Sequence, residues 1–230
     1  MIELIRISKR FGTHSVLSGI SLKVNPGSVV AVVGPNGAGK TILLDIITGF
    51  VRPTEGVCRV ANRDIVNLSV EEVARLRVGR TFQSVRLPFQ QTVRETLQVA
   101  VSPPGVAWMP FSFGWRAGRV DQMDLVEQTA AQFGISDLMN LQSGRLSFGQ
   151  RKLLAVACCA IRKPILVILD EPFSGVDSVG AEKIRDFLVR IRSQGGCGLV
   201  VEHNLMLFDS FIDERIILKE GKVRTEAGAR

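Results

Sequence analysis

Hydrophobic residues gather along the chain in short runs rich in Val and Ile, which are bounded by Gly, Pro, Asn or Asp. Such runs are typical of β-strands. We expect strands over Leu4–Ile7, Ile20–Val24, Val29–Val33, Val57–Val60, Ile165–Leu169, Gly198–Val201, Arg215–Leu218 and Lys222–Arg224. The run at 165–169 is uninterrupted, which is typical of a parallel strand buried on both faces. The last two strands should form a hairpin around Glu220-Gly221.

Longer segments with a helical spacing of apolar residues lie between these strands. We expect helices over Lys40–Thr48, Val93–Val101, Gln122–Phe133, Ser147–Ile161 and Ala181–Ile191. Ser69-Val-Glu-Glu72 matches a capping box and predicts a further short helix. The segment Ser102–Trp115 contains three Pro and two Gly, so it cannot form a regular helix. The pattern indicates an α/β core at both ends of the chain, with a helical insertion at about residues 84–160.

The composition agrees with one packed domain. Of the 230 residues, 46% are hydrophobic, which is enough for a core and excludes a disordered chain. The longest apolar run, Leu153–Ile161, has nine residues, whereas a membrane-spanning helix needs about 20. We therefore expect no membrane span, and the N-terminal residues lack the long apolar stretch of a signal peptide. The four cysteines show no CxxC spacing, so we expect reduced, buried thiols.

The chain carries a net charge of +7, and the excess is uneven. Residues 1–115 hold 13 basic and 7 acidic side chains. This bias suits anionic partners such as phosphates, an anionic membrane face or nucleic acid. Clustered basic runs are absent from the sequence, so a plain solvated surface is an equally good interpretation.

The strongest motif in the sequence is Gly34-Pro-Asn-Gly-Ala-Gly-Lys-Thr41, between a predicted strand and a predicted helix. It matches the phosphate-binding loop G-x-x-x-x-G-K-[ST] completely. Its glycines let successive backbone N–H groups point at one phosphate, and the following helix adds its positive end. Lys40 would reach the β and γ phosphates, and the Thr41 hydroxyl would bind Mg²⁺. A strand–turn–helix without a ligand is the plain alternative.

A second motif, Asp170-Glu171, follows the buried strand at 165–169. A carboxylate at the end of such a strand, beside a phosphate loop, is suited to bind Mg²⁺. We assign this role to Asp170, and Glu171 is placed to activate the attacking water. Alone, an apolar run followed by two acidic residues is more often structural.

A third motif, Leu146-Ser-Phe-Gly-Gln150, lies at the start of a predicted helix, about twenty residues before Asp170. Ser147 could simply cap that helix, but a Ser, a Gly and free helix N–H groups also make an anion site. The phosphate loop, this motif, Asp170-Glu171 and a later His occur in an order that resembles the ATP-binding-cassette (ABC) ATPases. The resemblance covers essentially the whole chain.

The resemblance implies a role for individual residues. Phe11 would stack on adenine, with Val16 in the same pocket. Glu171, His203, Gln83 and Lys40 would be catalytic, and Thr41, Gln83 and Asp170 would hold Mg²⁺. Asp177 would lie at the seam between two subunits. The implied nucleotide-binding residues are Phe11, Val16, Gly34, Pro35, Asn36, Gly37, Ala38, Gly39, Lys40, Thr41, Ile42, Ser147, Gly149 and Gln150.

Plain interpretations exist for single residues, and the sequence departs from the family pattern at three positions. Phe11 could be core, Gln83 a surface amide and His203 a polar cap after a strand. Phe148 stands where the commonest signature has Gly, although aromatic variants occur in amino-acid importer ATPases. Ile42 replaces a Thr or Ser, and Gly175 is unusual in its loop.

The resemblance also implies the fold and its division. We expect a P-loop NTPase of the ABC type, an α/β core with an N-terminal antiparallel β subdomain and an inserted helical subdomain. The single ATP-binding domain would span 1–230, with 1–83 and 161–230 forming the catalytic core. Residues 84–160 would form the helical signature subdomain.

Several stretches resemble the ATPases of branched-chain amino-acid importers: Gly79–Phe89, Thr92–Thr96, Val201–Asn204 and the insertion at 102–115. We therefore expect a subunit that hydrolyses ATP to power the import of amino acids or similar small solutes. Asp170–Asp177 also resembles lipopolysaccharide-export ATPases. A non-transport ATPase that acts on nucleic acid or ribosomes is a further alternative.

The expected cofactors are ATP and Mg²⁺. The expected partners are transmembrane permease subunits, a second ABC ATPase subunit (identical or different) bound through ATP, and an extracytoplasmic solute-binding protein, with no nucleic acid. The chain would lie on the cytoplasmic face of the inner (plasma) membrane as a peripheral protein. A membrane helix would dock near Ser84–Gln91. The four aromatics of Ser102–Trp115 would help to seat it, or would cover their own subdomain.

Overall fold

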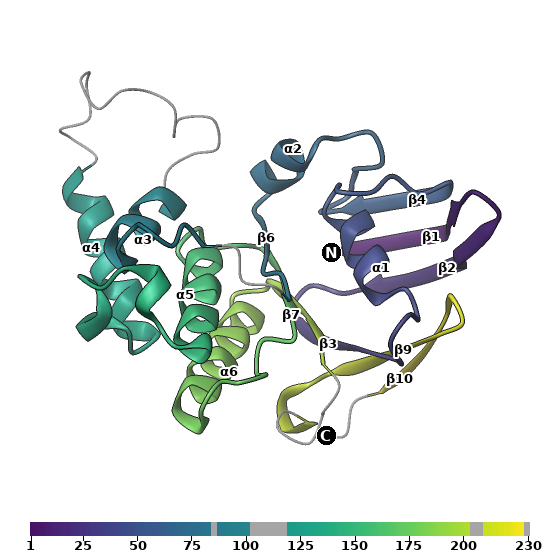
Figure 1. Cartoon of the computed structure of the whole chain (residues 1–230). Coiled ribbons are helices and arrows are strands. Elements are labelled where there is room, and N and C mark those ends of the chain that lie inside the picture. The colour runs from purple at the N-terminus through teal and green to yellow at the C-terminus, as the bar shows by residue number, and fades with distance from the viewer. Residues whose placement is uncertain (84–86, 102–118, 203–208, 228–230) are drawn as a thin grey trace. The chain divides into compact units, whose positions relative to one another are not determined.

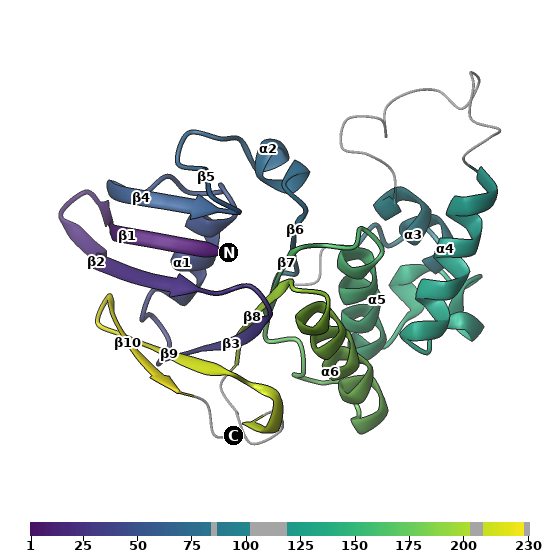
Figure 2. The same cartoon turned by 180° about the vertical axis from the view of Figure 1, so that it is seen from behind.

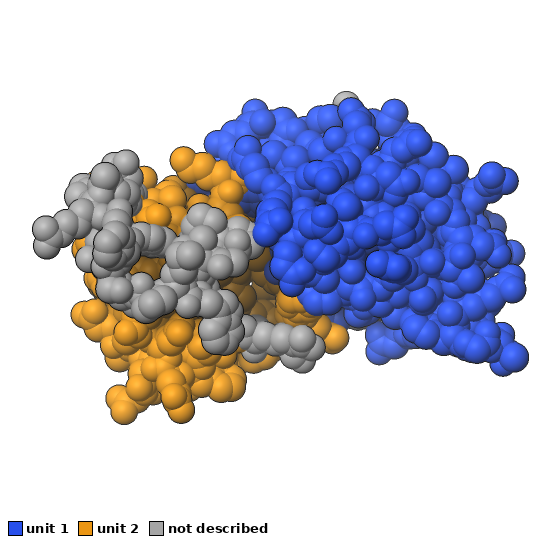
Figure 3. Space-filling model, turned by 90° about the horizontal axis from the view of Figure 1, so that it is seen from above, with its two compact units in different colours: residues 1–80, 164–171, 188–230 blue, residues 81–163, 172–187 orange. Residues whose placement is uncertain are grey.

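The computed structural model describes residues 1–83, 87–101, 119–202 and 209–227. These residues form two compact units, which are coloured separately in Figure 3. The first unit contains residues 1–80, 164–171 and 188–230, and the second contains 81–163 and 172–187. Residues 172–187 are part of this second compact unit, whereas the division implied by the family resemblance places them in the catalytic core.

The first unit contains a four-stranded antiparallel sheet with the order β2-β1-β4-β5. Its strands are β1 (Ile2–Phe11), β2 (His14–Val24), β4 (Glu55–Val60) and β5 (Arg63–Asp64). The strands β1 and β2 are longer than predicted, because their polar halves pair with each other, as Lys9 with Leu17 and Arg10 with Ser15. An antiparallel sheet can leave one face in water, so such strands need no apolar run.

The same unit contains a six-stranded sheet with the order β10-β9-β3-β8-β7-β6. Its strands are β3 (Ser28–Val33), β6 (Val78–Arg80), β7 (Leu166–Asp170), β8 (Cys197–Val201), β9 (Glu214–Lys219) and β10 (Lys222–Ala227). β9 and β10 form the predicted hairpin, and the other neighbouring pairs are parallel. Every residue of β7 is buried and β7 has a parallel partner on each side, as the uninterrupted apolar run predicted.

One hydrophobic core joins both sheets of this unit to helix α1 (Lys40–Ile47), which lies beside the four-stranded sheet (Figures 1 and 2). Leu43, Leu44 and Ile47 of the helix are fully buried against residues of β1, β3 and β7. The short helix α2 (Val70–Arg75) begins with the predicted capping box, in which Ser69 and Glu72 bond each other's backbone N–H.

The second unit is helical. Its helices are α3 (Val93–Val101), α4 (Arg119–Gln132), α5 (Phe148–Ala160) and the first part of α6 (Ser178–Ser193), with short 3-10 turns at Ser136–Leu138 and Ser143–Arg145. α3 packs against α4 and α5, and the rings of Phe133 and Phe187 meet edge to face at 5.7 Å. α6 begins three residues before the predicted start, because the Oδ1 of Asp177 accepts a hydrogen bond of 2.7 Å from the N–H of Gly180.

Other expectations have mixed outcomes. The four cysteines are free thiols as predicted; Cys58, Cys159 and Cys197 are buried, and burial raises the pKa of Cys58 to about 12. Across the described ranges, none of the helices has the length and apolar character needed to cross a membrane. The segment Ser102–Trp115, residues 84–86 of the expected docking region and His203 lie outside the described residues.

We predict that Ile168→Ala destabilises the chain by about 2–5 kcal/mol, because Ile168 is fully buried in the first unit and the substitution leaves a cavity. Val179→Ala is the control, since Val179 is 63% exposed, and it should change the free energy of unfolding by about 0.5 kcal/mol or less. Chemical denaturation measures both variants. Equal losses would contradict the placement of β7 in the core.

Candidate nucleotide-binding site

The register of three parallel strands brings the two phosphate motifs to the same sheet edge. Val32 of β3 and Asp170 of β7 both pair with Val201 of the intervening strand β8. The start of the Gly34–Thr41 loop and the Asp170 carboxylate are therefore level with each other, two strand spacings or about 10 Å apart. The carboxyl ends of parallel strands are where α/β proteins bind ligands.

Close backbone packing fixes the loop at residues 34–41. A Cβ atom on Gly34 would overlap the carbonyl oxygen of Leu218 in β9. A Cβ atom on Gly39 would lie 2.7 Å from Leu17 Cδ2, and Gly39 has a φ of +98° that L-residues rarely adopt. Both glycines are thus required by packing as well as by the backbone path. The loop is held between β9 and β2, and its chain continues directly into α1.

Lys40 lies across the loop at the first residue of α1. Its Nζ donates hydrogen bonds to the carbonyl oxygens of Gly34, at 2.6 Å, and of Pro35, at 3.0 Å. The side chain is largely buried, at 9% exposure. The ammonium charge is thereby held at the centre of the loop, where an anionic ligand would be bound.

The next two residues of α1 differ in exposure. Thr41, the second residue of α1, is exposed and directly follows the loop lysine. Ile42 is partly buried against the core of the first unit. The departure at position 42 therefore exchanges a hydroxyl for apolar packing.

Asp170 combines burial with neighbouring positive charge. The residue is only 7% exposed, and burial raises the pKa of its carboxyl above the ordinary value. The positive charges of Arg80 and Lys40 act in the opposite direction, and Glu171 adds to the increase. A cation bound next to Asp170 would offset the cost of burying this carboxylate.

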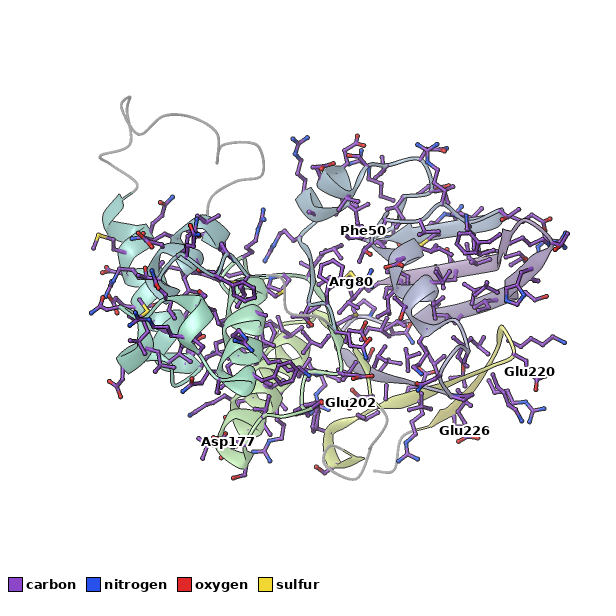
Figure 4. The ribbon with its side chains drawn as sticks, viewed as in Figure 1. Phe50, Arg80, Asp177, Glu202, Glu220 and Glu226 are labelled. Carbon is purple, nitrogen blue, oxygen red and sulfur yellow. The ribbon has the colours of Figure 1, made fainter. Side chains whose placement is uncertain are left out.

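Arg80 was not identified from the sequence, although its contacts tie the site together (Figure 4). This residue ends β6, is paired beside Ile168 of β7, and forms an ion pair of 2.6 Å with Asp45 of α1. It also donates a hydrogen bond to Thr48 and lies 5.7 Å from the ring of Phe50. Arg80 thus ties α1 to the strand next to Asp170. Nothing in the local sequence indicates a pair between residues 35 positions apart.

Glu171 has an unusual backbone conformation. Its φ is +48°, in the left-handed region that non-glycine residues seldom adopt. Its N–H donates to the carbonyl oxygen of Val201, which fixes the chain as it leaves β7. Strained residues cluster at functional sites. The half-buried carboxylate follows Asp170 directly, as the assigned roles require.

Phe11 and Val16 lie on the hairpin of β1 and β2. Phe11 is 50% exposed, with the Lys9 ammonium 4.8 Å from its ring centroid, so the ring is not part of the core. Val16 is half-buried and lies close to Gly39 of the loop. An exposed ring on the same hairpin as a residue that touches the loop is compatible with the predicted stacking on adenine.

In the second unit, Ser147 and Gln150 form a capping box at the start of α5. The Ser147 Oγ accepts a hydrogen bond from the Gln150 N–H at 3.2 Å, and Gln150 Oε1 accepts one from the Ser147 N–H at 2.9 Å. The plain interpretation of Ser147 as a helix cap is therefore confirmed. A capped start leaves the other N–H groups of the first turn, including that of Gly149, directed out of the helix.

Comparison with known proteins decides the family. The sequence model of the ABC transporter family matches residues 17–174. The chain belongs to the ABC transporter ATPase family. It is 30% identical to the high-affinity branched-chain amino acid transport ATP-binding protein BraF of Pseudomonas aeruginosa, over 96% of this chain and 89% of that protein.

Two further relatives agree. The chain is 30% identical to the probable branched-chain amino acid transport ATP-binding protein LivG of Methanocaldococcus jannaschii, over 97% of this chain and 89% of that protein. It superposes on the crystal structure of a nucleotide-free ATP-binding cassette from an ABC transporter with a TM-score of 0.85. That match has 29% identity and covers 100% of this chain and 92% of the other. The fold is thus that of an ABC ATPase, and the chain is an ATP-binding subunit that hydrolyses ATP.

The remaining family positions lie in the second unit or outside the described residues. Gln83 is exposed, three residues after Arg80. Asp177 is exposed and caps α6 through its bond to Gly180 (Figure 4). The assignments of Gln83, Asp177 and His203 stay predictions, as do those of the other site residues.

Lys40→Ala should weaken ATP binding by about ten- to a hundredfold, because the loop loses its buried cation and charged hydrogen bonds contribute about 1.5–3 kcal/mol. Titration with a fluorescent ATP analogue measures the affinity, and circular dichroism checks the fold. Lys222→Ala, at an exposed position of the first unit, is the matched control and should bind as the wild type does. Unchanged affinity in Lys40→Ala would show that this loop is not the phosphate site.

Proposed function

We propose that this chain powers an ABC importer of branched-chain amino acids or similar small solutes. The observation that carries the proposal is the complete phosphate loop, held with Lys40 at its centre and level with Asp170 on the same sheet edge. The names of the relatives that match most of the chain support the substrate class.

The nucleotide would be bound by residues of both units, taken from two different chains. One chain would contribute the loop at 34–42, with Phe11 and Val16 at the adenine. The partner chain would contribute Ser147, Gly149 and Gln150 at the start of α5, where helix N–H groups favour a negative ligand. Two chains would thus close head to tail around two ATP molecules and exclude water from the phosphates.

The residues near Lys40 fit a magnesium ion. Thr41 is exposed and has a hydroxyl group. Asp170 has a buried carboxylate, and a bound cation would offset the cost of burying its negative charge. Gln83 is the further ligand that the family pattern assigns. When bound, Mg²⁺ would neutralise charge on the β and γ phosphates.

Hydrolysis would be carried by positioned charges. Glu171 would accept a proton from the attacking water, whose oxygen bonds to the γ phosphorus as the bond to the bridging oxygen breaks. Lys40 and His203 would stabilise the charge on the transferred group. The products ADP and phosphate repel each other, so the two chains would then separate.

The partners follow from this cycle. Transmembrane permease subunits would receive the motion of the helical unit, and an extracytoplasmic solute-binding protein would deliver the cargo. The chain would bind peripherally on the cytoplasmic face of the membrane.

Its ATP turnover in the purified transporter should rise with cargo-loaded binding protein and should not respond to RNA or DNA. Stimulation by nucleic acid without membrane association would contradict this function.

Glu171→Gln should trap an ATP-bound dimer, because the amide keeps the shape of the carboxylate but cannot accept a proton. Loss of a general base slows turnover by about 10²–10⁴-fold. Size-exclusion chromatography with Mg-free ATP should show the dimer, and ADP should dissociate it. The wild-type chain alone should be largely monomeric.

Glu220→Gln provides a closely matched control. Glu220 is exposed on the β9–β10 turn and has a φ of +50°, almost the same left-handed conformation as Glu171 (Figure 4). The two variants therefore make the same substitution on the same backbone geometry. Glu220→Gln should hydrolyse ATP at the wild-type rate. The same rate in Glu171→Gln would exclude Glu171 as the base.

A further inference from the structure

Two departures from the family pattern contact each other within the second unit. Phe148, which follows the helix cap Ser147, packs its ring over Gly175 in the loop before α6. A Cβ atom on Gly175 would lie 2.7 Å from Cδ1 and 3.1 Å from Cε1 of Phe148. Real Cβ atoms essentially never lie within 3.0 Å of another heavy atom, so a side chain at position 175 would force the ring of Phe148 to move from its place.

Two more glycines bring the same segments together. A Cβ atom on Gly149 would lie 2.6 Å from the carbonyl oxygen of Gly175, and one on Gly180 would lie 2.6 Å from Val176 Cγ1 and 3.0 Å from Leu153 Cδ1. The start of α5 therefore touches the loop at residues 173–177 through Phe148 and through Gly149, and Gly180 of α6 packs against both segments. They form one packed element.

The environment of Phe148 indicates that this ring is not an ordinary core residue. The residue is 47% exposed, and its ring lies 5.0 Å from the ammonium of Lys152, which is itself largely buried. The ring atoms Cδ1 and Cε1 lie against Gly175, while nearly half of the residue's surface remains exposed. The loop on its other side is also exposed at Ser174, Gly175 and Asp177.

We propose that Phe148 is a positioning residue that holds the loop at residues 173–177 against the start of α5, and that Gly175 is present because the ring occupies the space of a side chain. This inference rests on the proposed function, in which Ser147, Gly149 and Gln150 meet the nucleotide of the partner chain. Phe148 would thereby hold Asp177 at a fixed position relative to Ser147, Gly149 and Gln150. The two surfaces that meet the partner chain then move as one.

The proposal distinguishes ATP binding from turnover. A single chain would bind ATP through residues 34–42, which belong to the first unit, whereas Phe148 belongs to the second. Phe148→Ala should therefore leave the dissociation constant of the single chain for ATP unchanged. It should lower kcat roughly ten- to a hundredfold, since small misplacements of positioned groups have effects of this size. Phe148→Tyr keeps the ring and should retain kcat.

Met123→Ala controls for the loss of an exposed apolar side chain, since Met123 is 51% exposed on α4 of the same unit. This variant should keep both the affinity and kcat. A Phe148→Ala variant with the kcat of Met123→Ala would overturn the positioning role. A parallel loss of kcat in Phe148→Tyr would also overturn it, because the aromatic ring would then not be the element that matters.

The pairing with Gly175 is tested through thermal stability. Gly175→Ala introduces both a left-handed alanine, at a φ of +71°, and the overlap with Phe148. Gly134→Ala introduces the left-handed alanine alone, since Gly134 has a φ of +65° and open space around its Cβ position. We expect Gly175→Ala to lower Tm further than Gly134→Ala does, by at least about 2 °C.

In the Phe148→Ala background the additional decrease in Tm caused by Gly175→Ala should disappear, because the ring is absent. The decrease in Tm caused by Gly134→Ala should persist. Equal effects of the two glycine substitutions, or an additional loss that persists without the ring, would overturn the pairing. If Gly175→Ala does not fold alone, its recovery in the Phe148→Ala background gives the same answer.

Failure of this inference is separable from failure of the proposed function. If the wild type hydrolyses ATP and Lys40→Ala does not, the proposed function stands, even where Phe148→Ala has no effect on kcat. Absence of hydrolysis in the wild type would overturn the function, while the stability measurements at positions 148 and 175 would still report on the packing.

Discussion

The pairing of β3 and β7 on either side of β8 is the constraint on which the rest of the site depends. Because Val32 and Asp170 share Val201 as their partner, the strand that feeds the phosphate loop and the strand that ends in Asp170 stop at the same level. A shift of one residue in β7 would exchange Asp170 and Leu169 and turn the carboxylate to the opposite face. Full burial of β7 makes such a shift costly, since it would also place the carboxylate in the apolar core. The geometry of the site is therefore a consequence of strand register.

Close backbone approach then fixes what the register has aligned. Gly34 lies against the carbonyl of Leu218 and Gly39 against Leu17, so the loop touches both sheets of the first unit. The same glycines that let N–H groups surround a phosphate are those without which the loop would not fit. Arg80 adds a second tie, because its ion pair with Asp45 connects α1 to the strand beside β7. The loop, the helix after it and the acidic strand end are consequently joined by packing and pairing within the chain itself.

The sequence predicted most of this arrangement, and the misses have physical reasons. Apolar runs and capping boxes located β3, β7, α1 and α2, since burial and caps leave local signals. Local signals were absent for the three-residue strand β6 and for the polar half of β1, which are stabilised by their neighbours in the sheet. The tie through Arg80 joins residues far apart in the chain, so only the fold brings them together. The loop glycines were found because their motif has a fixed spacing, and Asp170 and Glu171 because they follow an uninterrupted apolar run. The contact of Phe148 with Gly175 leaves no such local signal.

Two of the three departures from the family pattern add apolar packing, and the third, Gly175, leaves room for one of them. Ile42 packs against the core where a hydroxyl would otherwise lie, and Phe148 covers a glycine where the family pattern places no side chain. In both cases apolar packing is found beside a phosphate-binding segment, while the loop glycines, Lys40 and Thr41 match the family pattern. Packed apolar contacts do not depend on a ligand, whereas polar contacts to phosphate form only when nucleotide is present. The two segments that would meet the nucleotide are thus held in shape by the chain itself, so ATP would join two chains without first having to order either segment.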